Sequence, residues 1–162
     1  MRGLAALALL VFFMGTAQAQ QLAGSQDRLQ MLKKIQGSWL RDCEQVVSAG
    51  RTVFEQTRLG VDFTKLVFST KEYSNRECSL VVREYKTEYR YSLGDSIPVD
   101  AGQTAYELNL TPVSSPEGII RLPLKNLIHF NNGYLYFGLR DIQLKPEERL
   151  THLDRQLTFQ RY

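Results

Sequence analysis

The stretch QGSWLRDCEQ (residues 36–45) contains the single tryptophan of the chain, Trp39, and one of its two cysteines, Cys43. Before it, Leu29, Leu32 and Ile35 recur at helical spacing. This spacing predicts a short helix over Ser25–Gln36, capped by Ser25 and ended by Gly37. After Gly37, β-branched and aromatic residues dominate, and the periodicity becomes that of strands.

Turn residues recur about every ten positions after Gly37, which is typical of an all-β sandwich or barrel. The hairpin LIHFNNGYLYFG is the clearest, because Asn132-Gly133 suits a type I′ turn. We found no repeat or linker, so residues 20–162 are predicted to form a single domain. The predicted strands are Ser38–Val46, Thr52–Leu59, Thr64–Tyr73, Ser79–Ser92, Thr104–Thr111, Ile119–Leu122, Leu127–Phe130, Tyr134–Arg140 and Gln156–Arg161.

Three segments between these strands interrupt the pattern. SLGDSIPVDAGQ (92–103) and TPVSSPEG (111–118) are rich in turn-forming residues and are predicted to be long loops. QLKPEERLTHL (143–153) contains a candidate short helix that starts near Pro146.

One strand, CSLVVREYKTEYRYSL (78–93), has two contrasting faces. Glu84, Lys86, Glu88 and Arg90 form a solvent face, and the alternate positions should face inward. The inward set is Val81, Arg83, Tyr85, Thr87, Tyr89 and Tyr91. Its polar tips need a ligand, water or protein partners. A ligand cavity and packed tyrosines with hydroxyls at the rim are both consistent with this face.

The first 19 residues are typical of a cleaved signal peptide. Arg2 precedes an apolar run that is too short to span a bilayer, and Ala17-Gln18-Ala19 offers a small-x-small cleavage pattern. Gln20 is not a lipid-accepting cysteine, so we expect no stable membrane anchor after cleavage. The predicted location is therefore outside the cytoplasm, either periplasmic or secreted.

Two cysteines in an exported chain, Cys43 and Cys78, indicate one structural disulfide. On the chain-entropy model, such a bond stabilises a fold by about 3–4 kcal/mol. The formal net charge is +3, and the basic residues alternate with acidic ones. We therefore expect no nucleic-acid partner.

The sequence contains no recognisable catalytic constellation. His129 and His152 belong to no metal-binding or triad spacing, and no phosphate-binding glycine loop is present. We therefore expect no enzyme activity, metal or cofactor. A hydrolase would require one of these histidines to meet a carboxylate from a distant strand.

Gly37-Ser38-Trp39, following a short helix, resembles the G-x-W motif of lipocalin-type barrels. In an up-and-down barrel with an even number of strands, the last strand pairs with the first. Arg161 would then lie near Trp39, where a guanidinium over the indole contributes about 0.5–2 kcal/mol. Gly37, Trp39 and Arg161 are thus the predicted structural residues of a lipocalin-like antiparallel barrel, with about eight or nine strands.

A longer pattern is more specific. Gly37, Trp39 and Cys43, then Arg51, Phe54, Phe63, Tyr73 and Cys78, then GQTAYEL (102–108), are similar to the domain named after the adenomatosis polyposis coli down-regulated protein. The resemblance covers roughly 37–110. It implies a lipocalin-like barrel, a Cys43–Cys78 disulfide, and a pocket for a lipid or another hydrophobic ligand. The C-terminal half does not follow the pattern.

Two functions remain open. The first is a binding protein that holds a small hydrophobic or amphipathic ligand in its lumen, with Arg83 facing a carboxylate or phosphate head. The second is a protein-interaction module of the cell envelope, whose barrel is filled and whose loops 94–103 or 112–118 bind an unidentified partner. A lumen smaller than about 300 Å³ would favour the second. The candidate ligand-binding residues are Phe54, Phe68, Arg83, Tyr85, Tyr89, Tyr91, Tyr106, Leu108 and Tyr136.

Overall fold

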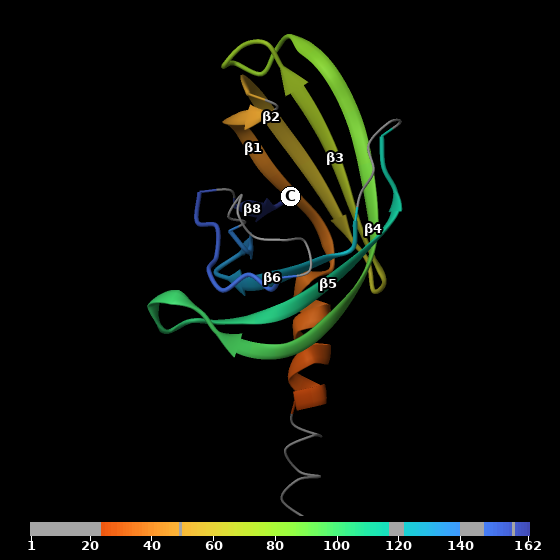
Figure 1. Cartoon of the computed structure of the whole chain (residues 1–162), viewed down its shortest axis with the longest axis vertical. Helices are drawn as coiled ribbons and strands as arrows, with labels where there is room; N and C mark the ends of the chain where they lie inside the picture. Colours follow the sequence, from red (N-terminus) through yellow and green to blue (C-terminus); the bar gives the residue numbers. More distant parts are fainter. Residues whose placement is uncertain (1–23, 49, 117–121, 140–147, 157) are drawn as a thin grey trace, which may run out of the picture.

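The fold is an antiparallel β-barrel that follows a short helix. The computed structural model describes residues 24–48, 50–116, 122–139, 148–156 and 158–162. Eight strands in this part of the chain follow one another around a closed barrel in sequence order (Figure 1). The predicted all-β, lipocalin-like barrel is thereby confirmed. The predicted signal peptide (1–19) lies outside the described residues.

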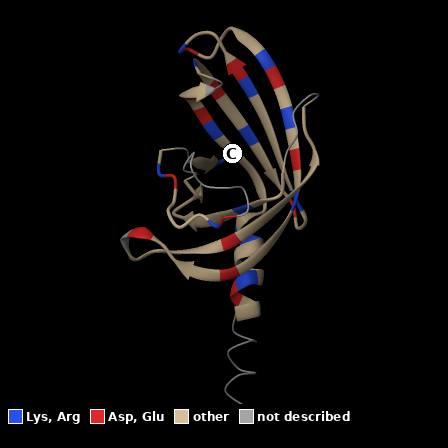
Figure 2. Cartoon of the chain, in the orientation of Figure 1, with Lys and Arg blue, Asp and Glu red and all other residues tan. Residues whose placement is uncertain are grey.

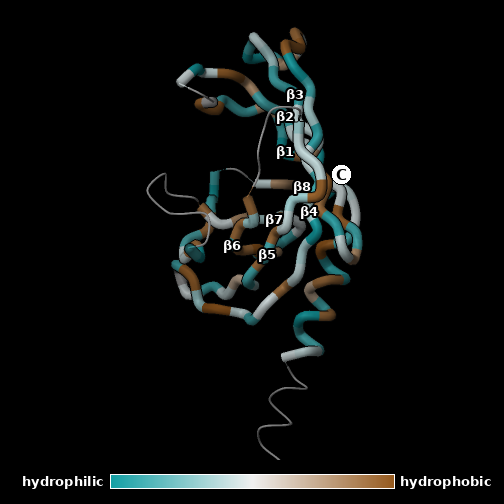
Figure 3. The backbone as a smooth tube through the Cα atoms, turned by 45° about the vertical axis from the view of Figure 1, so that its right-hand side comes forward, coloured by the Kyte–Doolittle hydropathy of each residue, from teal (hydrophilic) through white to brown (hydrophobic). Residues whose placement is uncertain are grey.

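Residues 24–35 are helical. The strands are β1 (Gly37–Ser48), β2 (Arg51–Val61), β3 (Lys65–Tyr73), β4 (Val81–Pro98), β5 (Thr104–Ser114), β6 (Leu124–Asn131), β7 (Tyr134–Phe137) and β8 (Phe159–Arg161). Hydrophobic and hydrophilic residues follow one another along the strands (Figure 3), because alternate residues face the barrel interior and the exterior. Lysines and arginines are likewise interspersed with acidic residues on β2, β3 and β4 (Figure 2).

The predicted long loop over 92–103 is wrong. β4 continues to Pro98, and only Val99–Gln103 forms the turn, with a 3-10 helix at Asp100–Gly102. A bulge between Leu93 and Ser96 absorbs the irregular residues. Gly94 permits the close pairing there, because a Cβ would lie 2.6 Å from Glu107 Oε2.

The C-terminal boundaries also differ from the predictions. β7 ends at Phe137 and β8 contains only Phe159–Arg161, so the predicted strands 134–140 and 156–161 were too long. Most of the predicted strand 119–122 and the start of the helix near Pro146 lie outside the described residues. Residues 148–151 are irregular. They lie against the outer face of β5–β7, where Leu150 and Leu153 are buried with Ala105 and Leu127.

The helix packs against the main core at one end of the barrel (Figure 1). Met31 and Ile35 are buried in that core, with Leu32 packed against it, whereas Leu29 is 49% exposed. The buried helical face is therefore displaced from the predicted one. Residue 24 is already helical, so Ser25 lies inside the helix and is not its cap. No helix in the described part is long and apolar enough to cross a membrane.

The β1–β4 sheet extends beyond the closed part of the barrel. β1 pairs with β8 only at Trp39 and Leu40, and the described pairing of β4 with β5 begins at Glu88. Strands β1–β4 continue past these points as a four-stranded sheet (Figure 1). A disulfide joins Cys43 of β1 to Cys78 in the β3–β4 connection, with Cα atoms 6.1 Å apart.

Candidate functional site

The inner face of the β1–β4 sheet lines a cavity of about 460 Å³. Its opposite wall is formed by β5–β7, Asp154 and Phe159 of β8. One part of the wall is polar and consists of Arg41, Glu55, Thr57, Thr70, Tyr85 and Thr87. The remainder is mainly apolar and includes Phe68, Tyr89, Leu110, Leu124, Phe137 and Phe159.

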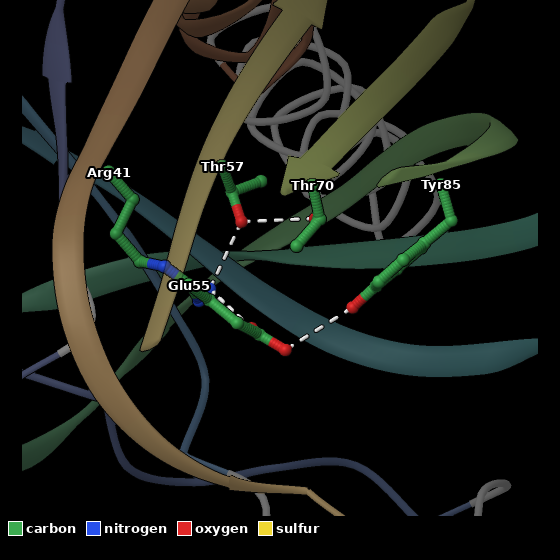
Figure 4. A network of polar contacts seen from close by, with 5 residues as sticks. All are labelled: Arg41, Glu55, Thr57, Thr70 and Tyr85. Atoms are coloured by element: carbon green, nitrogen blue, oxygen red, sulfur yellow. Dashed lines mark hydrogen bonds and ion pairs between the residues drawn. The ribbon is translucent and has the colours of Figure 1, made fainter. Parts of the chain in front are cut away.

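All of these polar residues except Thr87 form a connected network (Figure 4). Arg41 Nη2 donates to Glu55 Oε2 at 2.9 Å and to Thr57 Oγ1 at 3.0 Å. Thr57 Oγ1 and Thr70 Oγ1 are 3.1 Å apart, and the Tyr85 hydroxyl donates to Glu55 Oε1 at 3.3 Å. The side chains of Arg41 and Glu55 are each only 12% exposed. The network thus balances a cation and an anion on the cavity wall.

Strand alternation explains why these residues meet. Glu55 and Thr57 share their face of β2 with Leu59 and Val61, which are buried in the core. Arg41 shares the inward face of β1 with Trp39. Beyond Arg41 a bulge shifts the register, so that Glu44 is opposite Glu55.

Aromatic rings organise the apolar wall. Phe68 contacts Tyr89, Phe137 and Phe159, with ring centroids 5.9–6.2 Å apart. The Arg41 guanidinium lies 5.8 Å from the centroid of the Phe159 ring. Phe159 therefore links the polar and apolar walls, since β8 places its ring between them.

Burial and neighbouring acids affect the titration of two groups at this site. Burial raises the pKa of Tyr85, and the negative charges of Glu55 and Glu72 raise it further. Burial also raises the pKa of Glu44, against the lowering effect of Arg41, while Asp154 and Asp42 add to the rise. Tyr85 therefore stays a neutral donor, and acids are close neighbours around the cavity.

Three of the predicted ligand-binding residues, Phe68, Tyr85 and Tyr89, line the cavity. Leu108 and Tyr91 are buried in the core, and Tyr106 packs against that core near the helix. The Tyr91 hydroxyl donates to the carbonyl oxygen of Asp62 at 2.8 Å. These tyrosines thus divide between the two interpretations, because some line a cavity and others fill the core.

The other three predicted residues do not line the cavity. Arg83 is exposed near the start of β4, with its guanidinium 5.2 Å from the centroid of the Tyr85 ring. Phe54 has the opposite parity to Glu55 and Thr57, so it lies on the outer face of β2. Tyr136 has the opposite parity to the buried Leu135 and packs against the outer core.

Sequence reasoning missed Arg41, Glu55, Thr57 and Thr70. The alternation of Glu55 and Thr57 with Leu59 and Val61 in one strand was an available signal. It was overlooked because an inward face is normally identified from its large apolar residues. Phe54 was therefore assigned to the inward face, although its parity is that of the outer face.

The structural residues meet at the helix end of the barrel. The Arg161 guanidinium lies 4.7 Å from the centroid of the buried Trp39 ring, which confirms the predicted contact. Arg161 Nη2 donates to the carbonyl oxygen of Lys34 at 2.6 Å, and Trp39 Nε1 donates to that of Ile35 at 2.8 Å. Both side chains therefore bind the last turn of the helix, just before Gly37.

The histidines do not form a catalytic arrangement in the described residues. His129 Nδ1 donates to the carbonyl oxygen of Thr104 at 2.7 Å, and His152 Nδ1 lies 2.9 Å from Thr151 Oγ1. In this part of the chain neither imidazole contacts a carboxylate. Nor do three or more histidine, cysteine, aspartate or glutamate residues of the described ranges gather into a possible metal site.

No protein-family model, curated protein or solved structure matches this chain.

Proposed function

We propose that this protein binds a small, mostly apolar or amphipathic molecule in the lumen of its barrel. The observation that carries the proposal is the cavity of about 460 Å³ between the β1–β4 sheet and the opposite wall. Ligand pockets usually measure about 300–1,000 Å³ and combine apolar walls with a few placed polar groups. The aromatic wall and the Arg41–Glu55 network correspond to these two components.

We propose a binding protein rather than an enzyme, and an exported one. The Cys43–Cys78 disulfide supports export, because such bonds persist mainly outside the reducing cytoplasm. The sequence-based alternative, an interaction module with a filled barrel, is less well supported by a cavity of this volume. The resemblance to lipid-binding barrels remains a proposal that the chemistry of the cavity accommodates.

A cavity-filling variant tests the function directly. Thr87 is 4% exposed and lines the cavity, so Thr87→Phe would place a ring in the space that a ligand needs. We expect the purified protein to enhance the emission of N-phenyl-naphthylamine, an uncharged apolar probe. Thr87→Phe should weaken that binding by about tenfold or more.

The matched control is Thr111→Phe, since Thr111 is an exposed β5 residue with the opposite parity to the buried Leu110. It adds the same ring outside the lumen and should bind the probe like the parent. Circular dichroism would establish that both variants are folded. Equal probe binding by the parent and a folded Thr87→Phe variant, or no binding by the parent at all, would contradict the proposal.

A further inference from the structure

The lumen contains a cation, but its charge is already balanced. Arg41 Nη2 lies 2.9 Å from Glu55 Oε2, and both side chains are nearly buried. In a partly dehydrated site, a paired guanidinium offers little net attraction to a second anion. A ligand carboxylate at this position would compete with Glu55 for the same cation.

Further acids surround this pair. Asp154 lines the cavity, and its Oδ1 accepts a hydrogen bond from the Gln156 amide at 2.9 Å. Glu44 lies within electrostatic reach of Asp154, and Glu72 lies within electrostatic reach of Tyr85. Arg83 is a cation near Tyr85; it lies opposite Glu72 in the register of β3 and β4 and is exposed to solvent. Among the described residues named here, acids therefore outnumber cations.

Two buried polar groups on the wall have no hydrogen-bond partner in the described part of the chain. They are Arg41 Nε and Thr87 Oγ1. The first is a donor only, and the second can both donate and accept. A buried donor without a partner is costly, so both atoms favour a ligand that brings an acceptor to this wall.

We propose that the lumen selects an uncharged amphiphile, one whose polar end is a hydroxyl, ester or amide, over a fatty-acid carboxylate. This inference rests on the proposed function and specifies its ligand class. The oxygen of such a head accepts from Arg41 Nε or Thr87 Oγ1 without adding charge beside Glu55 and Asp154. The aromatic wall around Phe68 packs against the alkyl chain. A cationic amine fits less well, because it brings donors but no acceptor to Arg41.

Displacement of the naphthylamine probe by dodecanol, dodecanoate and dodecylamine at neutral pH tests the selectivity. The three compounds contain the same number of carbon atoms and differ mainly in their heads. We expect dodecanol to displace the probe at a concentration at least about tenfold lower than either charged compound. If dodecanoate or dodecylamine binds as tightly as dodecanol, the inference is wrong while the binding function stands. If the parent binds neither the probe nor any of the three compounds, the function itself fails.

Glu55→Gln tests the cause of the selectivity. It leaves Arg41 without its anion, so dodecanoate should gain at least about tenfold relative to dodecanol. The control is Glu88→Gln, which removes an acid from an ion pair with Lys65 on the outward parity of β4 and should leave the ratio unchanged. If Glu55→Gln does not fold, Asp154→Asn removes an acid without breaking the pair and should shift the ratio in the same direction. An unchanged ratio in the folded variant would overturn the inference.

Discussion

Arg161 joins the last strand to the first through one stacked pair and one hydrogen bond. Its guanidinium covers Trp39 and binds the carbonyl oxygen of Lys34. We expect Arg161→Ala to lower the free energy of unfolding by about 1–2 kcal/mol, since the stacking and a charge-assisted bond are both lost. Urea unfolding followed by circular dichroism measures this loss. Trp39 fluorescence is not a suitable readout, because the substitution itself would change it.

Arg58 provides a matched comparison for Arg161. Its guanidinium lies 5.5 Å from the centroid of the ring of Tyr162, which is 73% exposed. Arg58→Ala should change the free energy of unfolding by less than about 0.5 kcal/mol, as is usual at exposed sites. If both variants lost the same stability, Arg161 would have no special role in closing the barrel.

Tyr91 makes stability sensitive to alkaline pH. Burial raises its pKa from the ordinary value of 10.0 to about 12. Between these two pH values the unfolded chain releases a proton that the folded chain retains, so the free energy of unfolding falls as the pH rises. We expect Tyr91→Phe to show a smaller fall than the parent when urea unfolding is measured across this range. A parallel fall in both proteins would contradict this assignment.

At the scale of elements, alternation and turn chemistry could be predicted from the sequence, but register shifts could not. The Asn132-Gly133 turn and the inward parity of Tyr85 and Tyr89 followed from local residue types. The bulge in β1 depends on pairing with β2, which no local pattern reveals. The parity of Glu55 could be read from β2 alone, but its contact with Arg41 could not be predicted, because the network requires four strands, β1 to β4, in register.

The segment before β8 shows a second limit of sequence reasoning. Leu150 and Leu153 are apolar residues that a strand or a helix could equally contain. In the structure they lie outside the helix and the named strands, and they pack against the outer face of β5–β7. Only the packed sheet creates this second core, so residue types alone do not indicate it.

Gly138 allows this segment to approach the sheet. A Cβ at this position would lie 2.6 Å from Leu150 Cδ1 and 2.9 Å from Asn126 Oδ1. We expect Gly138→Ala to lower the free energy of unfolding by about 1–3 kcal/mol, because the added carbon overpacks the contact. Chemical denaturation of the parent and the variant measures the loss.

Gly60 is the appropriate control for Gly138. It lies in β2, and an added Cβ would meet nothing within 4 Å. Gly60→Ala should leave the free energy of unfolding unchanged or raise it by up to about 1 kcal/mol, because it restricts the unfolded chain. If Gly138→Ala were equally harmless, the close approach of Leu150 would not limit this position.

At the scale of the whole molecule, the barrel is closed by its shortest strand. β8 pairs with β1 at two positions and with β7 at two, whereas β2 and β3 pair continuously from Phe54 to Val61. Opening this seam breaks few hydrogen bonds, so it should require less free energy than opening β2–β4. We expect closure to be coupled to the proposed ligand binding, since Phe159 of β8 is part of the cavity wall.

Hydrogen exchange measured by mass spectrometry tests this coupling. We expect peptides that contain 159–161 to exchange faster than those from β2 and β3 in the ligand-free protein. Dodecanol should slow exchange in β8 more than in β2, because a ligand packed against Phe159 is lost when the seam opens. Thr87→Phe, which blocks the cavity, should remove the effect of dodecanol, and Thr111→Phe should retain it. Protection that is uniform over the barrel would show that the seam opens only with global unfolding.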